Sequence, residues 1–136
     1  MKIAEQRGTG AVAASTPPRR ISIVDDDASI REALKSLMRS VRFNVEAFAS
    51  AEEFLASDRL HDTACLILDV TLPGMSGFEL QNRLNSERRA IPIVFITAHA
   101  DEAARQLALR GGAIDLLSKP VRSEPLFKAI QSAIGR

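Results

Sequence analysis

The chain has one cysteine, no tryptophan and no tyrosine among its 136 residues. A single cysteine cannot form an internal disulfide. Because Cys65 lies inside an apolar run, we expect a buried structural thiol rather than a redox switch. Phenylalanine is the only aromatic type, so a stacking surface for single-stranded nucleic acid is poorly supplied. The net charge of +1 gives no strong attraction to nucleic acid or to anionic membranes.

Long hydrophobic runs are also missing. No apolar run approaches the roughly 18 residues that a membrane span needs, and residues 1–20 contain no apolar core of a secretory signal. We therefore expect no membrane partner and a reducing, cytoplasmic setting. Residues 1–18 are rich in Gly, Ala, Ser, Thr and Pro and are expected to form a disordered tail. Residues 19–136 are expected to form one domain.

Strand and helix patterns alternate after the tail. Five apolar runs are expected to be strands, at residues 21–24, 43–48, 64–69, 91–97 and 114–118. Each is followed by apolar residues at helical spacing, which indicates βαβ units and a mostly parallel sheet. The second run alternates apolar and polar residues and is therefore placed at an edge of the sheet. The third is apolar without alternation up to Asp69, as in a strand covered on both faces.

Local signals predict where the helices begin and end. Ser29–Glu32 and Ser50–Glu53 have the spacing of capping boxes, and Ser76–Glu79 is expected to begin a third helix. Gly111–Gly112 is expected to end the fourth. Ser123–Pro125 is expected to begin the last.

Residues able to handle a phosphoryl group lie at the carboxyl ends of four of the expected strands. In a parallel sheet these positions meet at one edge, where open α/β folds bind ligands. Carboxylates suit Mg²⁺, one carboxylate could accept a phosphoryl group, and a hydroxyl and an ammonium could hold it. The residues are Asp25, Asp26, Asp27, Asp69, Thr97 and Lys119.

Each of these features also has a plain structural explanation. The acidic run could be a solvated turn with Asp27 as a helix N-cap, Thr97 an ordinary strand residue, and Lys119 a surface lysine beside a turn. Asp69 is harder to explain in this way, because an unpaired carboxylate at the end of a buried strand is costly. Asp69 should be either exposed at the sheet edge or bound to another group. Repulsion from the neighbouring acids should raise pKa values there until a cation binds.

Together these motifs resemble the receiver domains of bacterial two-component response regulators, over about residues 20–134. The resemblance rests on Val24–Asp27, Asp69–Gly77, Ile96–Ala98 and Lys119–Pro120, in this order and with these spacings. Residues 112–120 look most like the branch that often carries helix-turn-helix output domains. The resemblance implies an α/β fold, a doubly wound, flavodoxin-like (βα)5 domain with a five-stranded parallel sheet in the order 2-1-3-4-5.

The resemblance also implies roles for the acidic residues. Asp69 would be the phosphoacceptor. Asp26 would bind Mg²⁺ directly, with Asp25 acting mainly through water. The main-chain carbonyl of Thr71 would be a further metal ligand, and Mn²⁺ is an alternative cation.

Thr97 would donate a hydrogen bond to one phosphoryl oxygen, and Lys119 would pair with another. Position 116 usually carries Phe or Tyr in this family, with a ring that moves inward on activation. This chain has Leu116 instead, so the usual aromatic readout is missing while the phosphoryl chemistry is retained.

The implied function is a phosphorylation-activated signalling switch. Its phosphoryl donor would be a sensor histidine kinase or a phosphotransfer protein, and its output a downstream effector protein or a fused DNA-binding domain absent from this chain. The domain itself would contact no nucleic acid. It would not be an enzyme in the usual sense, because it catalyses only its own phosphorylation and dephosphorylation.

Two alternatives remain open at this point. One is an aspartate-nucleophile phosphatase, a class with a second Asp two residues after the nucleophile, where this chain has Thr71. The other is a pseudo-receiver that binds partners without phosphorylation. Against it, no member of the acidic, Thr and Lys set is missing.

Overall fold

A computed structural model describes residues 20–135 of the chain. The strands are β2 (Arg20–Val24), β3 (Asn44–Phe48), β4 (Thr63–Asp69), β5 (Ile93–Thr97) and β6 (Asp115–Ser118). The helices are α2 (Ala28–Ser40), α3 (Ala51–Ala56), α4 (Gly77–Ser86), α5 (Glu102–Arg110) and α6 (Ser123–Ile134), with a 3-10 turn at Asp58–His61. The predicted tail, residues 1–18, lies outside the described residues.

The five strands form one parallel sheet in the order β3-β2-β4-β5-β6. In strand numbers this is 2-1-3-4-5, so the predicted fold is confirmed. The alternating strand β3 lies at an edge, as its pattern indicates. The apolar strand β4 is the central strand of the sheet, between β2 and β5.

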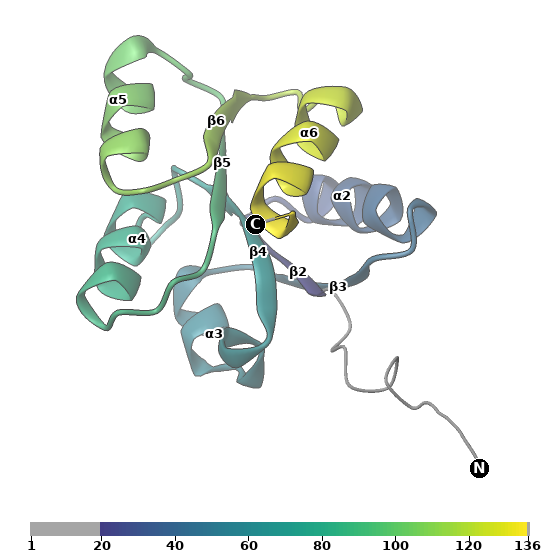
Figure 1. Cartoon of the computed structure of the whole chain (residues 1–136), viewed down its shortest axis with the longest axis horizontal. Coiled ribbons are helices and arrows are strands. Elements are labelled where there is room, and N and C mark those ends of the chain that lie inside the picture. Colours follow the sequence, from purple (N-terminus) through teal and green to yellow (C-terminus); the bar gives the residue numbers. More distant parts are fainter. Residues whose placement is uncertain (1–19, 136) are drawn as a thin grey trace.

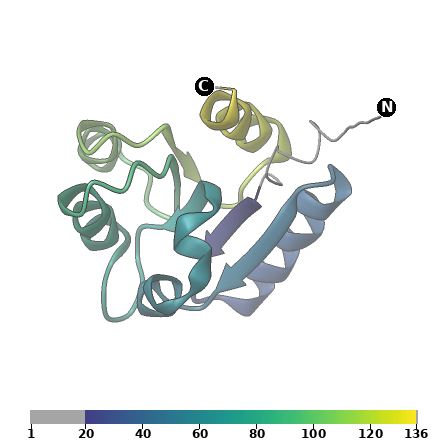
Figure 2. The ribbon, with the colours of Figure 1, turned by 60° about the horizontal axis from the view of Figure 1, so that its bottom comes forward.

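Helices cover both faces of the sheet. Figure 1 shows α2 and α6 on one side and α3, α4 and α5 on the other, and the view in Figure 2 shows the same division. Two buried apolar clusters fill the space between the layers, one around Phe54, Leu80 and Phe95 and one around Met38 and Leu126. Cys65 is fully buried, as expected. Among the described residues, no helix is long and apolar enough to cross a membrane.

The helix starts match the local signals in part. The capping box at Ser76–Glu79 is complete. Ser50 caps α3, but the carboxylate of Glu53 accepts the N–H of Ala49 rather than that of Ser50. The capping box predicted at Ser29–Glu32 is wrong.

Asp27 is the N-cap of α2 in place of Ser29. Its Oδ1 accepts the main-chain N–H of Ser29 at 2.8 Å and that of Ile30 at 3.4 Å. Ser29 already lies inside the helix, and Glu32 pairs instead with Lys35. Asp and Ser have similar N-cap preferences, so composition alone does not decide which of two nearby residues begins a helix. The plain structural explanation considered for Asp27 is confirmed.

Candidate functional site

The sheet register brings the singled-out residues to one edge. Val24 pairs with Leu68, so Asp25 and Asp69 follow neighbouring positions on β2 and β4. Thr97 ends β5 and pairs with Ser118, the residue before Lys119. The parallel arrangement of β2, β4, β5 and β6 therefore gathers acids, a hydroxyl and an ammonium beyond the carboxyl ends of the strands.

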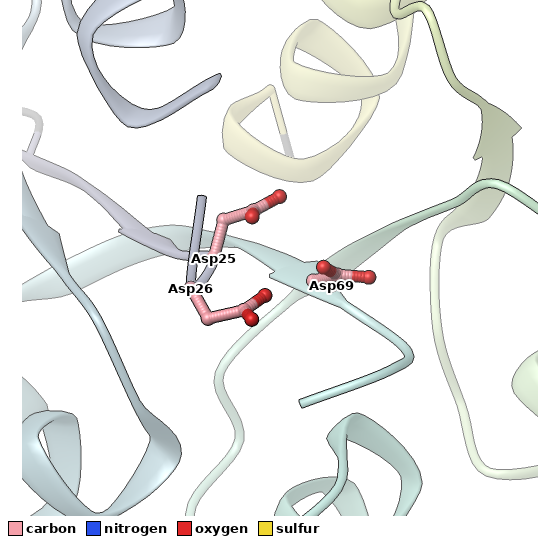
Figure 3. Close-up of side chains that lie close together, drawn as sticks. All are labelled: Asp25, Asp26 and Asp69. Atoms are coloured by element: carbon pink, nitrogen blue, oxygen red, sulfur yellow. The ribbon is translucent and has the colours of Figure 1, made fainter. Parts of the chain in front are cut away.

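Three carboxylates form a cluster at this edge. Asp25, Asp26 and Asp69 each place an oxygen within 4.8 Å of the others. Figure 3 shows their side chains gathered beyond the ends of β2 and β4. Asp25 and Asp69 are buried, whereas Asp26 is exposed. An exposed carboxylate beside two buried ones leaves a side of the cluster open to solvent, which suits a hard cation that keeps several waters.

The two oxygens of the Asp25 carboxylate have different surroundings. Its Oδ1 accepts the main-chain N–H of Asp27 at 2.9 Å. Lys119 Nζ lies 2.8 Å from Asp25 Oδ2 as an ion pair, yet within residues 20–135 this oxygen has no partner in hydrogen-bond geometry. A buried carboxylate oxygen with unused acceptor capacity is costly unless something else satisfies it. The acidic cluster therefore fits a divalent cation.

Lys119 joins the two buried carboxylates. Its Nζ donates to Asp69 Oδ2 at 3.0 Å in addition to its ion pair with Asp25. Burial lowers the pKa of Lys119, but the two carboxylates together outweigh this effect and hold the pKa above its ordinary value. Lys119 is therefore a fixed positive charge at neutral pH.

Asp69 is bound rather than exposed. Besides Lys119, its side chain accepts the main-chain N–H of Thr71 at 3.1 Å through Oδ1. Burial raises the pKa of Asp69 above its ordinary value, and the charge of Asp25 adds to this, while the hydrogen bonds from Lys119 and Thr71 oppose it. The expected repulsion between acids is present, but burial is the larger cause.

Thr97 is buried at the end of β5. Its Oγ1 accepts the main-chain N–H of His99 at 3.1 Å, so its own proton remains for another acceptor. Its main-chain oxygen accepts the N–H of Lys119 at 2.8 Å, which ties the ends of β5 and β6 together. Thr97 and Lys119 are thus held side by side, at the end of β5 and just after β6.

Two residues that position this site were given no role from the sequence, although Gly77 lies in the Asp69–Gly77 motif. Arg31, in the first turns of α2, donates from Nη1 to the main-chain oxygen of Asp25 at 2.8 Å. Gly77 begins α4 so close to β4 that a Cβ there would overlap the main-chain oxygen of Asp69. The turn-like sequence around Gly77 could have suggested a close approach. No local pattern marks the contact of Arg31, which depends on how α2 packs.

A family model described as "Response regulator receiver domain" matches residues 21–131. Nodulation protein W of Bradyrhizobium diazoefficiens is 43% identical over 130 residues, which cover 96% of this chain and 57% of that protein. Response regulator protein TodT of Pseudomonas putida is 44% identical over 114 residues, covering 84% of this chain and 50% of TodT. The chain thus spans only about half the length of the curated relatives that it matches.

Solved structures of response regulators also superpose on this chain. The response regulator StyR superposes with a TM-score of 0.81 at 44% identity, covering 88% of this chain and 60% of StyR. The structure called FixJ-N superposes with a TM-score of 0.78 at 32% identity, covering 89% of this chain and 97% of that one.

Proposed function

The chain belongs to the response regulator receiver domain family, and from this premise we propose that Asp69 accepts a phosphoryl group in a cation-dependent reaction that switches the domain between two states. The observation that carries the proposal is the contact network of Asp69. Its carboxylate is buried, faces two further acids, and is held by Lys119 on one oxygen and by the Thr71 amide on the other.

Asp69 is the nucleophile in this proposal. With a phosphohistidine as donor, an oxygen of the Asp69 carboxylate forms a bond to phosphorus while the bond between phosphorus and the histidine nitrogen breaks. The proton that the leaving imidazole needs comes from the donor protein or from water. The product is an aspartyl phosphate. Phosphoryl transfer depends mostly on positioning and charge neutralisation. Lys119, already 3.0 Å from Asp69, supplies a positive charge for the transferred oxygens, and the free proton of Thr97 supplies a hydrogen bond.

Receiver domains generally bind Mg²⁺ at such an acidic pocket. In this chain we propose that Asp26 holds the cation directly, that Asp25 acts mainly through water, and that Asp69 and the main-chain carbonyl of Thr71 complete the protein ligands. The cation would neutralise charge on the phosphoryl group and relieve repulsion among the three carboxylates. Mn²⁺ also prefers carboxylate and carbonyl ligands and should substitute for Mg²⁺.

We further propose that the phosphoryl donor is a histidine-phosphorylated sensor kinase or phosphotransfer protein. Such an exchange would take place in the cytoplasm. The domain would then catalyse only its own phosphorylation and dephosphorylation, without turnover of a free substrate. The relatives are longer than this chain and several are described as transcriptional regulatory proteins, which supports an output effector acting on gene expression.

The family match favours this function over the phosphatase alternative. The phosphatase class requires a second Asp at position 71, and the exposed Thr71 there has no carboxylate to act as an acid. The complete set of acids, Thr97 and Lys119 argues equally against a pseudo-receiver.

The direct test is incubation with acetyl phosphate and Mg²⁺ followed by intact-mass spectrometry. The wild-type chain should gain one phosphoryl group, and Asp69→Asn should gain none. Omission of the divalent cation, with EDTA present, should abolish the gain. Equal labelling of Asp69→Asn would show that the phosphoacceptor lies elsewhere, and steady release of phosphate from a phosphomonoester would support the phosphatase instead.

A further inference from the structure

A glutamate far from Asp69 in the sequence holds the loop that follows Asp69. This loop, residues 70–76, connects β4 to α4 and is called the β4–α4 loop below. Oε2 of Glu52, in the first turn of α3, accepts the main-chain N–H of Met75 at 2.8 Å across 23 residues of sequence. The Glu52 contact links α3 to the far end of the loop.

The near end of the β4–α4 loop is tied to the sheet. The N–H of Val70 donates to the main-chain oxygen of Ile96 at 3.0 Å, and the N–H of Thr71 donates to Asp69 at 3.1 Å. Leu72 is buried in the apolar core. These contacts fix one end of the loop, and a contact at the far end limits the movement that remains to the backbone between them, on which Thr71 lies.

The far end of the loop is held by the packing of Met75 against the apolar core and by hydrogen bonds. The N–H of Ser76 bonds to Glu79 in the capping box, and the N–H of Gly77 bonds back to Val70. Within residues 20–135, Met75 is the one residue at this end whose main-chain N–H bonds to a different element, through Glu52.

The backbone is shaped to receive this carboxylate. Gly74 has a φ of +73°, in the left-handed region that favours glycine. A Cβ on Gly74 would lie 2.7 Å from Oε2 of Glu52, so the carboxylate packs directly against the bare backbone. The hydrogen bond to Met75 holds the pKa of Glu52 below its usual range. Glu52 is thus a charged, solvent-exposed side chain whose carboxylate contacts the loop through Met75 and Gly74.

We propose that Glu52 is a positioning residue for the cation site. By holding the β4–α4 loop it keeps the main-chain carbonyl of Thr71 in place for the metal, a role that rests on the function proposed above. Residues that support metal ligands from the second layer typically contribute about 10- to 100-fold to metal affinity. Glu52 acts through four residues of backbone, so its removal should weaken Mg²⁺ binding about five- to tenfold, at or below the low end of that range.

Glu53 provides a matched control. It is the next residue of the same helix and also accepts one main-chain N–H, but from Ala49 at 3.1 Å, next to its own helix. Glu53→Ala removes the same charge and a similar hydrogen bond without touching the β4–α4 loop. Glu52→Gln keeps a neutral acceptor oxygen of the same length and should retain most of the wild-type affinity.

The experiment measures Mg²⁺ binding to the 136-residue chain by NMR, from the shifts of main-chain amide signals. In Glu52→Ala the Met75 amide proton should move upfield as its hydrogen bond is lost, and the Kd for Mg²⁺ should rise about five- to tenfold. The maximal rate of labelling by acetyl phosphate, measured at saturating Mg²⁺, should stay within about twofold of wild type, because Glu52 touches no reacting atom.

Three results would overturn the proposal. An unchanged Kd in Glu52→Ala, with normal Mg²⁺ binding by the wild type, would show that Glu52 has no positioning role and would leave the proposed function intact. An equal rise of the Kd in Glu53→Ala would assign the effect to helix α3 as a whole. Failure of the wild type to bind Mg²⁺ at all would overturn both this proposal and the cation-dependent function.

Discussion

Replacing Lys119 by methionine tests whether the two buried carboxylates depend on one ammonium. Lys119 Nζ lies 2.8 Å from Asp25 and 3.0 Å from Asp69, and the two acids are 0% and 4% exposed. Breaking a buried ion pair from one side typically costs about 3–5 kcal/mol, because the remaining charge is left uncompensated. The Lys119 side chain is itself 17% exposed, so water can reach part of the site. The lower end, about 3 kcal/mol, is therefore expected.

This loss should be easy to detect. For a chain of 136 residues, about 4 °C of Tm corresponds to 1 kcal/mol, so Lys119→Met should melt about 12 °C below the wild type. Far-UV circular dichroism with EDTA present is the appropriate assay, since the chain has no tryptophan for fluorescence. Lys128→Met is the matched control, because Lys128 is exposed on α6; it should change stability by less than about 0.5 kcal/mol.

The cause of the loss can be tested separately from its size. Adding Asp69→Asn to Lys119→Met should recover at least part of the stability, because an amide replaces an unpaired buried carboxylate. Loss of the ammonium also raises the pKa of Asp69 further in the folded state. The stability lost by Lys119→Met should therefore be largest at pH values above the raised pKa of Asp69. It should become smaller as the pH falls through that pKa, because protonation removes the unpaired charge. If Lys119→Met is as stable as Lys128→Met at pH 7, the ion-pair reasoning is wrong.

Three further outcomes are expected. Burial raises the pKa of Cys65 to about 12, so the thiol should not react with Ellman's reagent at pH 8 until the chain is denatured, and a fast reaction of the native protein would contradict its burial. Ser76→Ala removes the hydrogen bond to the Glu79 amide and should cost about 1 kcal/mol in urea denaturation; an unchanged midpoint would mean that the capping box contributes nothing. Leu116, 4% exposed here, should stay buried when a beryllofluoride phosphoryl mimic is bound, and a crystal structure with Leu116 turned outward in either state would refute this.

Local sequence patterns predicted most of the strands and helices of the fold. The apolar runs place all five strands, because a buried strand and an amphipathic helix leave different periods in the sequence. The periodicity of apolar residues does not determine the order of the strands in the sheet. That order was predicted from the family resemblance. The 3-10 turn at Asp58–His61 was not anticipated, since four residues are too few to show a period.

The start of α2 was predicted wrongly because two nearby residues can both act as its N-cap. Ser29–Glu32 has the spacing of a capping box, but Asp27 lies two residues earlier and caps the helix instead. Both residue types can satisfy helix N–H groups, so the local sequence left two possible starts and the structure shows the earlier one.

The sequence by itself determined which residues stand at the ends of the strands, and hence that acids, Thr97 and Lys119 would meet at one edge of a parallel sheet. Only the tertiary structure decided that Asp25 is buried while its neighbour Asp26 is exposed. It also decided that Lys119 reaches Asp69 across 50 residues and that Glu52 reaches Met75 across 23. The physical reason is that strand-end positions follow from local periodicity, whereas burial and long-range contacts depend on how separate elements pack together.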